Sequence, residues 1–391
     1  MVNSFRFASL PAILFRNGSI AELPGLTRKF GGPIVLVTGK SSFTESERGK
    51  KLLQLLEEED TTIYHVSVPS EPSPALIDKA VDSYRDNNIK LIVAIGGGSV
   101  LDAGKAISAM LTVPGSIRDY LEGIGQREHP GTKIPFIAIP TTSGTGSEAT
   151  KNAVISEVGP RGFKKSLRHD YFVPDMAILD PELTLNCPPE LTAACGMDCF
   201  TQLTEAFLSD KASDYTDVFA LLGLKAIKNS LVRSVRNGED ITARADMSYA
   251  SLNSGICLAN AGLGTVHGFA SSIGGWYNIP HGLICGTLMA VTNRVNVREL
   301  RACSGNHALT KYAELGKLFL DIEGKIDDYY IDGFIDYLYK LISDLQLPGL
   351  AGFGLEERHI EEICAQTDNK NNPVKLSLEK LVEILHERLK T

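Results

Sequence analysis

The sequence predicts two domains of different class, an α/β domain followed by an all-helical domain. The first half alternates short apolar runs with helical patterns, as strands and helices of a parallel sheet do. The second half carries apolar residues at helical spacing and lacks strand signals. Between them the segment at 180–190, DPELTLNCPPE, interrupts both patterns with adjacent prolines. We therefore expect an α/β domain over 1–185 and a helical domain over 186–391.

The strands of the first domain follow one another along the chain. The N-terminal segment up to about Ser19 predicts a first strand and turn. Apolar, β-branched runs then predict strands at 33–39, 61–68, 90–99, 133–142 and 176–180. One helix is expected from Pro74 to about Asn87 and another from near Val100. This alternation indicates a parallel sheet. In the second half, segments such as 220–238 and 332–347 predict the helices of a bundle.

Composition and charge exclude several classes of protein. The 391 residues carry a formal net charge of −8, and the basic residues are scattered, which argues against nucleic acid or an anionic membrane as partner. No apolar run approaches the roughly 20 residues that span a bilayer. The N-terminus carries Arg6 and Arg16 and lacks the features of a secretory signal, so we expect a cytoplasmic protein. The seven cysteines show no paired spacing, which favours reduced, buried thiols over disulfides or a zinc-thiolate site.

Two polar, glycine-rich segments follow predicted strands. GGGS at 96–99 joins a strand to a helix start, where free N–H groups and a positive helix end suit a phosphate, although such glycines also occur for packing. PTTSGTGSEAT at 140–150 offers many hydroxyl donors, although it could be only a polar loop. Because carboxyl ends of neighbouring parallel strands meet, we expect the two segments to share a nucleotide. Asp102 either faces its nicotinamide or lies on an exposed helix face.

The residues after the strand that ends at Thr38 indicate which dinucleotide is used. An acid at this place commonly binds the adenosine ribose and repels a 2′-phosphate. The chain has Gly39, Lys40 and Ser41 there, with one cation and no acid. This favours NADPH over NADH, although a surface lysine needs no such explanation.

Candidate metal ligands lie in the second half. Asp198 and Gln202 are four residues apart and share a helix face, and Glu205 lies three residues further along it. His267 is expected in a second helix, and His281 begins a turn or helix after a proline. A carboxylate and two imidazoles suit Fe²⁺ or Zn²⁺, although single histidines in helices more often have other roles.

Several motifs together resemble one family. GGGSVLDAGKAIS, PTTSGTGSEAT, DPELT, GMDCFTQLTEAF and HGFASSIGGWYNIPHG are similar, in order and interval, to the signatures of the iron-containing (group III) alcohol dehydrogenases. The resemblance covers about residues 5–390. It implies a dehydroquinate synthase-like fold, in which a dinucleotide-binding α/β domain and a helical metal-binding domain enclose the site, and a homodimer.

The resemblance also implies roles for particular residues. Gly97, Gly98 and Ser99 would hold the pyrophosphate, and Asp102 would lie near the nicotinamide. The residues expected to line or cover the cofactor are Thr141, Thr142, Ser143, Thr145, Lys165 and Leu183. Asp198, His267 and His281 match three metal ligands of the family. The segment 37–42, VTGKSS, resembles members that use NADP.

Two positions depart from the family pattern. Gln202 stands where the family usually has a fourth ligand, a histidine, and its amide oxygen is a weaker donor for Fe²⁺ or Zn²⁺. Ser271 stands where many members have a histidine near the nicotinamide. A proton relay would then run through water, Ser271 or a cofactor hydroxyl.

The expected activity is NAD(P)-linked interconversion of a small primary alcohol and its aldehyde, favouring aldehyde reduction, with Asp102 and Ser271 as candidate catalytic residues. One alternative is a reductase of a maleylacetate-like acid, for which Arg168 is the candidate anion-binding residue. A polyol dehydrogenase or a dehydroquinate-synthase-like lyase would keep the fold. The remaining alternative is a non-catalytic nucleotide-binding protein that has lost its metal.

Overall fold

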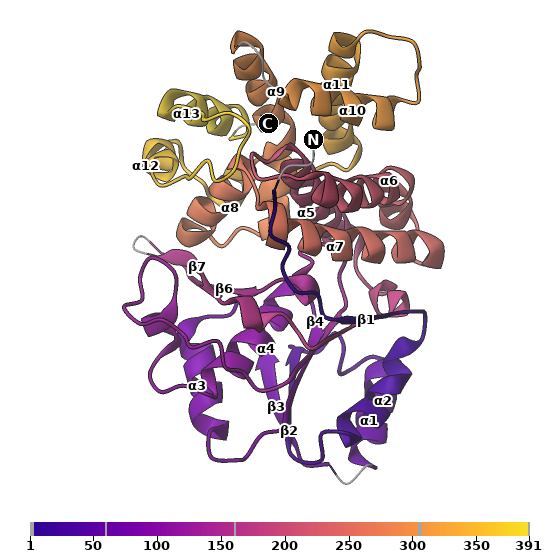
Figure 1. Cartoon of the computed structure of the whole chain (residues 1–391), viewed down its shortest axis with the longest axis vertical. Helices are drawn as coiled ribbons and strands as arrows, with labels where there is room; N and C mark the ends of the chain where they lie inside the picture. The colour runs from indigo at the N-terminus through magenta and orange to yellow at the C-terminus, as the bar shows by residue number, and fades with distance from the viewer. Residues whose placement is uncertain (1–3, 59–60, 160–161, 304–306, 390–391) are drawn as a thin grey trace.

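The computed structural model describes residues 4–58, 61–159, 162–303 and 307–389. Figure 1 shows a sheet domain made by the first half of the chain and a layer of helices made by the second half. The described chain begins and ends beside the helical part, so its N-terminal segment runs from there down to the sheet. The predicted fold class, an α/β domain followed by a helical domain, is confirmed.

A six-stranded sheet forms the centre of the first domain within the described ranges, and its strands run parallel in the order β1-β8-β5-β4-β2-β3. The strands are β1 (Ala12–Phe15), β2 (Ile34–Gly39), β3 (Ile63–Val68), β4 (Leu91–Gly96), β5 (Phe136–Pro140) and β8 (Met176–Leu179). Every internal run predicted as a strand contains one of them. Strands β4 and β5 are fully buried, which explains why their sequences are apolar without alternation.

In the described part of the domain, four helices flank this sheet and one hairpin lies outside it. The helices are α1 (Leu23–Arg28), α2 (Glu47–Glu57), α3 (Pro74–Tyr84) and α4 (Gly98–Met110). Strands β6 (Asn152–Glu157) and β7 (Phe163–Arg168) form an antiparallel pair that the sequence pattern does not predict. The hairpin packs on α4 and on the helical domain, so it joins the two domains beside the site.

The order in which the chain adds strands to the sheet reverses between β2 and β4. After β2 it adds β3 on one side, and it then crosses back to place β4 on the other side of β2. In the register of these two strands Thr38 pairs with Ile95, so their carboxyl ends lie level. Ligands of open α/β sheets bind at such a reversal. The segments after β2 and β4 are therefore placed together at the edge that faces the helices.

The second domain is helical throughout its described part. Its helices are α5 (Pro189–Leu208), α6 (Asp214–Arg236), α7 (Ile241–Ala261), α8 (Thr265–Trp276), α9 (His281–Ala302), α10 (Ala308–Leu320), α11 (Asp327–Asp344), α12 (Ile360–Ala365) and α13 (Leu378–Glu387). Helix α5 is central, because it packs against α6, α7 and α9 and is buried on nearly every side beyond its first turn. No helix in the described ranges is long and apolar enough to span a membrane.

Candidate metal and cofactor site

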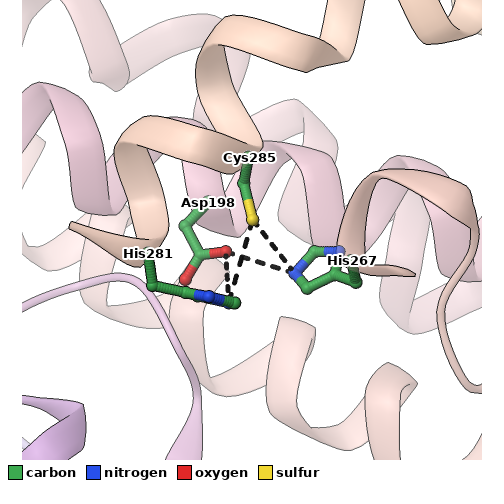
Figure 2. Close-up of side chains that lie close together, drawn as sticks. All are labelled: Asp198, His267, His281 and Cys285. Atoms are coloured by element: carbon green, nitrogen blue, oxygen red, sulfur yellow. Dashed lines mark hydrogen bonds and ion pairs between the residues drawn. The ribbon is translucent and has the colours of Figure 1, made fainter. Parts of the chain in front are cut away.

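Four side chains from three helices converge in the helical domain. Asp198 comes from the middle of α5, His267 from the first turn of α8, and His281 and Cys285 from the first two turns of α9. Figure 2 shows them pointing toward one another. One donor atom from each lies within 4.8 Å of the others. This is the arrangement in which proteins hold a divalent metal ion.

Asp198 and the two histidines are the ligands that the sequence predicts, and the fold brings them together. The carboxylate Oδ1 of Asp198 lies 3.2 Å from Nε2 of His267 and 3.8 Å from Nε2 of His281. Asp198 and His267 are 2% and 3% exposed, so their polar atoms have little access to solvent. A charged carboxylate buried in this way needs a cation or strong donors beside it.

A close helix contact brings His281 to Asp198. A side chain at Gly282 would place its Cβ 2.4 Å from the carbonyl oxygen of Ala194 on α5. Only glycine allows this approach of the two backbones, and the contact puts the first turn of α9 directly over the middle of α5.

Glu205 fixes the orientation of the His267 ring. Its carboxylate accepts a hydrogen bond from the backbone N–H of Val266 at 2.7 Å and lies 2.6 Å from Nδ1 of His267. With Nδ1 protonated and bonded to the carboxylate, the lone pair of Nε2 is directed at the cluster. Such outer carboxylates orient metal-binding histidines and increase their basicity. The sequence placed Glu205 on the stripe of Asp198 but gave it no function.

Gln202 lies beside the cluster with its amide nitrogen turned toward Asp198. Its Nε2 is 3.5 Å from Oδ2 of Asp198 and 3.4 Å from the carbonyl oxygen of Gly144. Both neighbours are acceptors, so the nitrogen and not the oxygen of the amide belongs on this side. Among the described residues Oε1 of Gln202 has no hydrogen-bond partner.

The charges of the cluster suit a bound cation. Burial would raise the pKa of Asp198, but the neighbouring imidazoles of His281 and His267 hold it below its ordinary value. Burial would lower the pKa of His267, but Cys285 and the carboxylates of Glu205 and Asp198 raise it well above the usual range. Burial and the Lys164 cation lower the pKa of His281 to about 3, which leaves that ring neutral. The cluster thus offers a carboxylate, the neutral imidazole of His281, and the imidazole of His267 in surroundings that favour a positive charge. This donor set fits a divalent ion.

The predicted phosphate segment lies at the start of α4. Gly97 is the N-cap of the helix, and Gly98 is its first residue. A Cβ on Gly98 would lie 2.7 Å from the side chain of Thr145, so the segment packs tightly against the polar segment after β5. The hydroxyl of Ser99 donates to Glu71, and Glu71 also accepts from Nζ of Lys164 at 3.0 Å. The two predicted cofactor segments therefore lie in contact.

The segment after β5 also connects the sheet to the metal-bearing helices. Thr142 lies against Gly97, and Ser143 exchanges a hydrogen bond with Ser248 of α7. Another α7 residue, Ser254, donates to the carbonyl oxygen of Gly144, which also accepts from Gln202. Thr141 follows the strand directly, and its N–H donates to the carbonyl oxygen at the end of β4. These contacts place the predicted cofactor residues next to the metal cluster.

The two candidate catalytic residues are engaged within the protein. Asp102 accepts hydrogen bonds from the Ser147 hydroxyl at 2.5 Å and from the Val154 N–H at 2.9 Å, one on each carboxylate oxygen. Burial raises the pKa of this carboxyl despite the nearby Lys105 cation. Ser271 lies one turn after His267 on α8 and donates to its carbonyl oxygen at 2.9 Å.

The remaining predicted residues lie at the rim of the sheet. Lys40 is exposed just after β2, next to half-buried Gly39 and Ser41, and Leu183 is half-buried after β8. Lys165 is exposed on β7, whereas the neighbouring Lys164 turns toward Glu71, with its side chain 9% exposed. Because successive side chains of a strand alternate between faces, only one of these lysines can face the site. No strand was predicted here, so the sequence pattern could not distinguish them.

Comparison with known proteins agrees with this architecture. The model of the iron-containing alcohol dehydrogenases matches residues 11–181, and the model of the C-terminal domain of Fe-containing alcohol dehydrogenases matches residues 192–389. The chain belongs to the iron-containing alcohol dehydrogenase family, as its motifs predict.

Curated relatives and solved structures extend over most of the chain. Alcohol dehydrogenase 4 of Schizosaccharomyces pombe is 32% identical over 350 residues, 89% of this chain and 79% of that protein. The NAD-dependent methanol dehydrogenase of Bacillus methanolicus is 30% identical over 391 aligned residues, 97% of this chain and 98% of its own. An archaeal halo-thermophilic alcohol dehydrogenase from a Red Sea brine pool superposes with a TM-score of 0.90 at 26% identity, covering 100% of both chains.

Proposed function

We propose that this protein is a metal-dependent, NAD(P)-linked oxidoreductase that interconverts a small primary alcohol and its aldehyde and favours aldehyde reduction. The observation that carries the proposal is the convergence of Asp198, His267 and His281 beside the two cofactor segments. Alcohol dehydrogenases among the relatives, including one named for methanol, support a small alcohol as substrate.

The residues divide between two binding tasks. Asp198, His267 and His281 would hold Fe²⁺ or Zn²⁺, and Glu205 would orient the ring of His267. The phosphates would lie against Gly97, Gly98 and Ser99. The residues proposed to line or cover the dinucleotide are Gly39, Lys40, Ser41, Asp102, Thr141, Thr142, Ser143, Thr145 and Leu183, with Lys164 in place of the expected Lys165 because the Lys164 side chain is the one that turns inward.

When bound, the metal ion would polarise the substrate oxygen and the nicotinamide would exchange a hydride with the adjacent carbon. The chain itself supplies position and exclusion of water. Asp102 ties α4 to Ser147 in the segment after β5 and to Val154 in β6, and so fixes one wall of the site. Ser271, one turn after the ligand His267 on α8, is the residue proposed to pass a proton to or from the substrate oxygen, directly or through water.

The proposed cofactor preference is for NADP, and it rests on Lys40. This exposed cation at the carboxyl end of β2 would attract a 2′-phosphate, and the segment lacks the acid that would repel it. Lys40→Ala is expected to raise the KM for NADPH about tenfold, the effect of losing roughly 1.4 kcal/mol, with little change for NADH. An equal effect on both cofactors would contradict this preference.

The function is tested by NADPH and NADH oxidation with a panel of small aldehydes. Chelator-treated protein would be assayed before and after addition of Fe²⁺ or Zn²⁺. Turnover that the metal restores, and that is faster with NADPH, is the expected result. Cofactor binding without turnover with any metal or aldehyde would refute the proposal and favour a non-catalytic protein.

The rival proposal is an acidic, maleylacetate-like substrate. Arg168, its candidate anion-binding residue, is exposed at the end of β7 and bonds to Glu122 at 2.6 Å. That pairing offsets the charge that a carboxylate substrate would require, so the neutral aldehyde is favoured.

We also propose a cytoplasmic homodimer. The edge strand β1 leaves Ile13 and Phe15 exposed, and Phe5 stacks on the exposed ring of Tyr215 nearby. An unpaired strand edge beside apolar side chains is typical of a surface that a second copy covers. Light scattering would show a mass twice that of the chain. The seven unpaired cysteines fit a reducing compartment.

A further inference from the structure

Cys285 belongs to the metal cluster but is not among the ligands that the family resemblance implies. It lies one turn after His281 on α9 and is fully buried. Its sulfur is 3.6 Å from Nε2 of His267 and 3.8 Å from Nε2 of His281, the two nitrogen atoms proposed to bind the metal. Figure 2 shows the sulfur directed to the same point as the carboxylate and the two rings.

The distances among the four donors match a tetrahedral metal site. Zinc–sulfur bonds of about 2.3 Å and zinc–nitrogen bonds of about 2.0–2.1 Å put tetrahedral donors about 3.6 Å apart, and nitrogen–oxygen pairs about 3.4 Å apart. The sulfur–nitrogen distances of Cys285 are 3.6 and 3.8 Å. The oxygen–nitrogen distances of Asp198 are 3.2 and 3.8 Å. These four distances lie within a few tenths of an ångström of tetrahedral spacing, and no two of the four donors are more than 4.8 Å apart, so movement of the side chains would let one metal ion contact all of them.

Gln202 does not compete for this position. Its amide nitrogen faces the Asp198 carboxylate, and turning the oxygen inward would set it against two acceptor oxygens, on Asp198 and Gly144. The chain thus lacks a usable donor at the family's fourth ligand position, and a thiol stands at the open corner of the cluster.

We infer that Cys285 is the fourth protein ligand of the metal, in place of the histidine that the family has at position 202. This inference rests on the proposed function, because it assumes the metal site of Asp198, His267 and His281. On binding, the thiol releases its proton to solvent and the thiolate sulfur donates an electron pair to the ion, with no change of oxidation state. A thiolate is a soft ligand that suits Zn²⁺ or Co²⁺, so the donor set favours zinc over iron.

Cobalt spectroscopy on the full-length, chelator-treated protein tests the inference without relying on activity. Co²⁺ in a tetrahedral site gives visible ligand-field bands, and a thiolate ligand adds an intense near-ultraviolet charge-transfer band. We expect both in the unaltered protein and in Cys195→Ser, a control on α5 outside the cluster. Cys285→Ser and Cys285→Ala should retain the visible bands, lose the near-ultraviolet band, and bind Zn²⁺ at least about tenfold more weakly.

A double variant tests the inference by a gain of metal affinity rather than by a loss. Gln202→His added to Cys285→Ala should restore Zn²⁺ affinity without restoring the near-ultraviolet band, because nitrogen then replaces sulfur. Visible bands without the near-ultraviolet band in the unaltered protein, or a near-ultraviolet band that persists in Cys285→Ser, would overturn the role of Cys285 and leave the proposed function standing. Absence of all Co²⁺ bands in the unaltered protein would overturn the metal site itself and this inference with it.

Discussion

Replacing Glu205 by glutamine removes the group that sets the tautomer of His267. The carboxylate uses one oxygen to accept from the Val266 N–H at 2.7 Å and the other to bind Nδ1 of His267 at 2.6 Å. An amide has one oxygen, so Glu205→Gln cannot accept both bonds. If its oxygen keeps Val266, its nitrogen donates to Nδ1 and the ring proton moves to Nε2. A protonated Nε2 has no lone pair for a metal.

The cost can be estimated for either orientation of the amide. In the opposite orientation the amide nitrogen faces the Val266 N–H, and a buried donor without a partner costs about 1–3 kcal/mol. Loss of an outer carboxylate from a metal-bound histidine typically lowers metal affinity by about 10–100-fold, or about 1.4–2.7 kcal/mol. The two energies are of similar size. We therefore expect Glu205→Gln to raise the Kd for Zn²⁺ by about 10–100-fold.

Competition against a chromophoric chelator measures that Kd directly. Glu148→Gln provides a matched control for metal binding, because Glu148 is another buried carboxylate, in the cofactor segment at 140–150 and outside the metal cluster. The control should bind Zn²⁺ as the unaltered protein does. A folded Glu205→Gln protein with unchanged Zn²⁺ affinity would refute the idea that this carboxylate selects the tautomer of His267.

Three further predictions concern the cofactor segment, pH and the metal. Gly98→Ala forces a Cβ to within 2.7 Å of Thr145, so overpacking should cost about 1–3 kcal/mol in the free energy of unfolding and weaken NADPH binding, measured by fluorescence titration; an unchanged Kd would contradict the close packing of the two segments. Burial raises the pKa of Glu148 from 4.5 to about 7, so the folded chain keeps a proton that the unfolded chain loses. The free energy of unfolding should therefore fall as pH rises through 4.5–7, by at most about 1.4 kcal/mol per pH unit, and Glu148→Gln should remove this slope in urea titrations. Chelation should lower the thermal midpoint by the equivalent of about 2.7 kcal/mol for metal held at 100 times its Kd, and a midpoint that EDTA leaves unchanged would exclude tight binding to the folded state.

The fold was largely predictable because its strongest signals are local. Buried parallel strands such as β4 are continuous apolar runs, and the glycines after β4 mark where the chain turns into α4. The β6–β7 hairpin was not predicted, because its strands lack a local signal of this kind. Its second strand, FKKSLR, carries three charged residues of six, and its position is determined by contacts with β6 and α8 rather than by periodicity.

The site was predictable where its residues repeat at helical spacing. Asp198 and Gln202 could be placed on one face, but which atom of Gln202 faces Asp198 depends on the carbonyl of Gly144, 58 residues away in the chain. The contact between Glu205 and His267 spans 62 residues and is likewise tertiary. Cys285 is different, because it lies four residues after His281 and the helix start at His281 was foreseen as one alternative. Testing each cysteine for that spacing would have revealed it.

The glutamine at position 202 and the thiol at position 285 compensate for each other in the proposed metal site. A glutamine at position 202 ties Asp198 to Gly144 in the cofactor segment, which orients the carboxylate but supplies no donor to a metal. The thiol of Cys285 supplies that donor from the neighbouring helix α9, at distances that leave the other three donors in place. A thiolate also adds a second negative charge, so Asp198 and Cys285 together would neutralise a divalent ion. Such a site is a weaker Lewis acid than one with three imidazoles and a carboxylate, which suits reduction of an already reactive aldehyde better than oxidation of an alcohol.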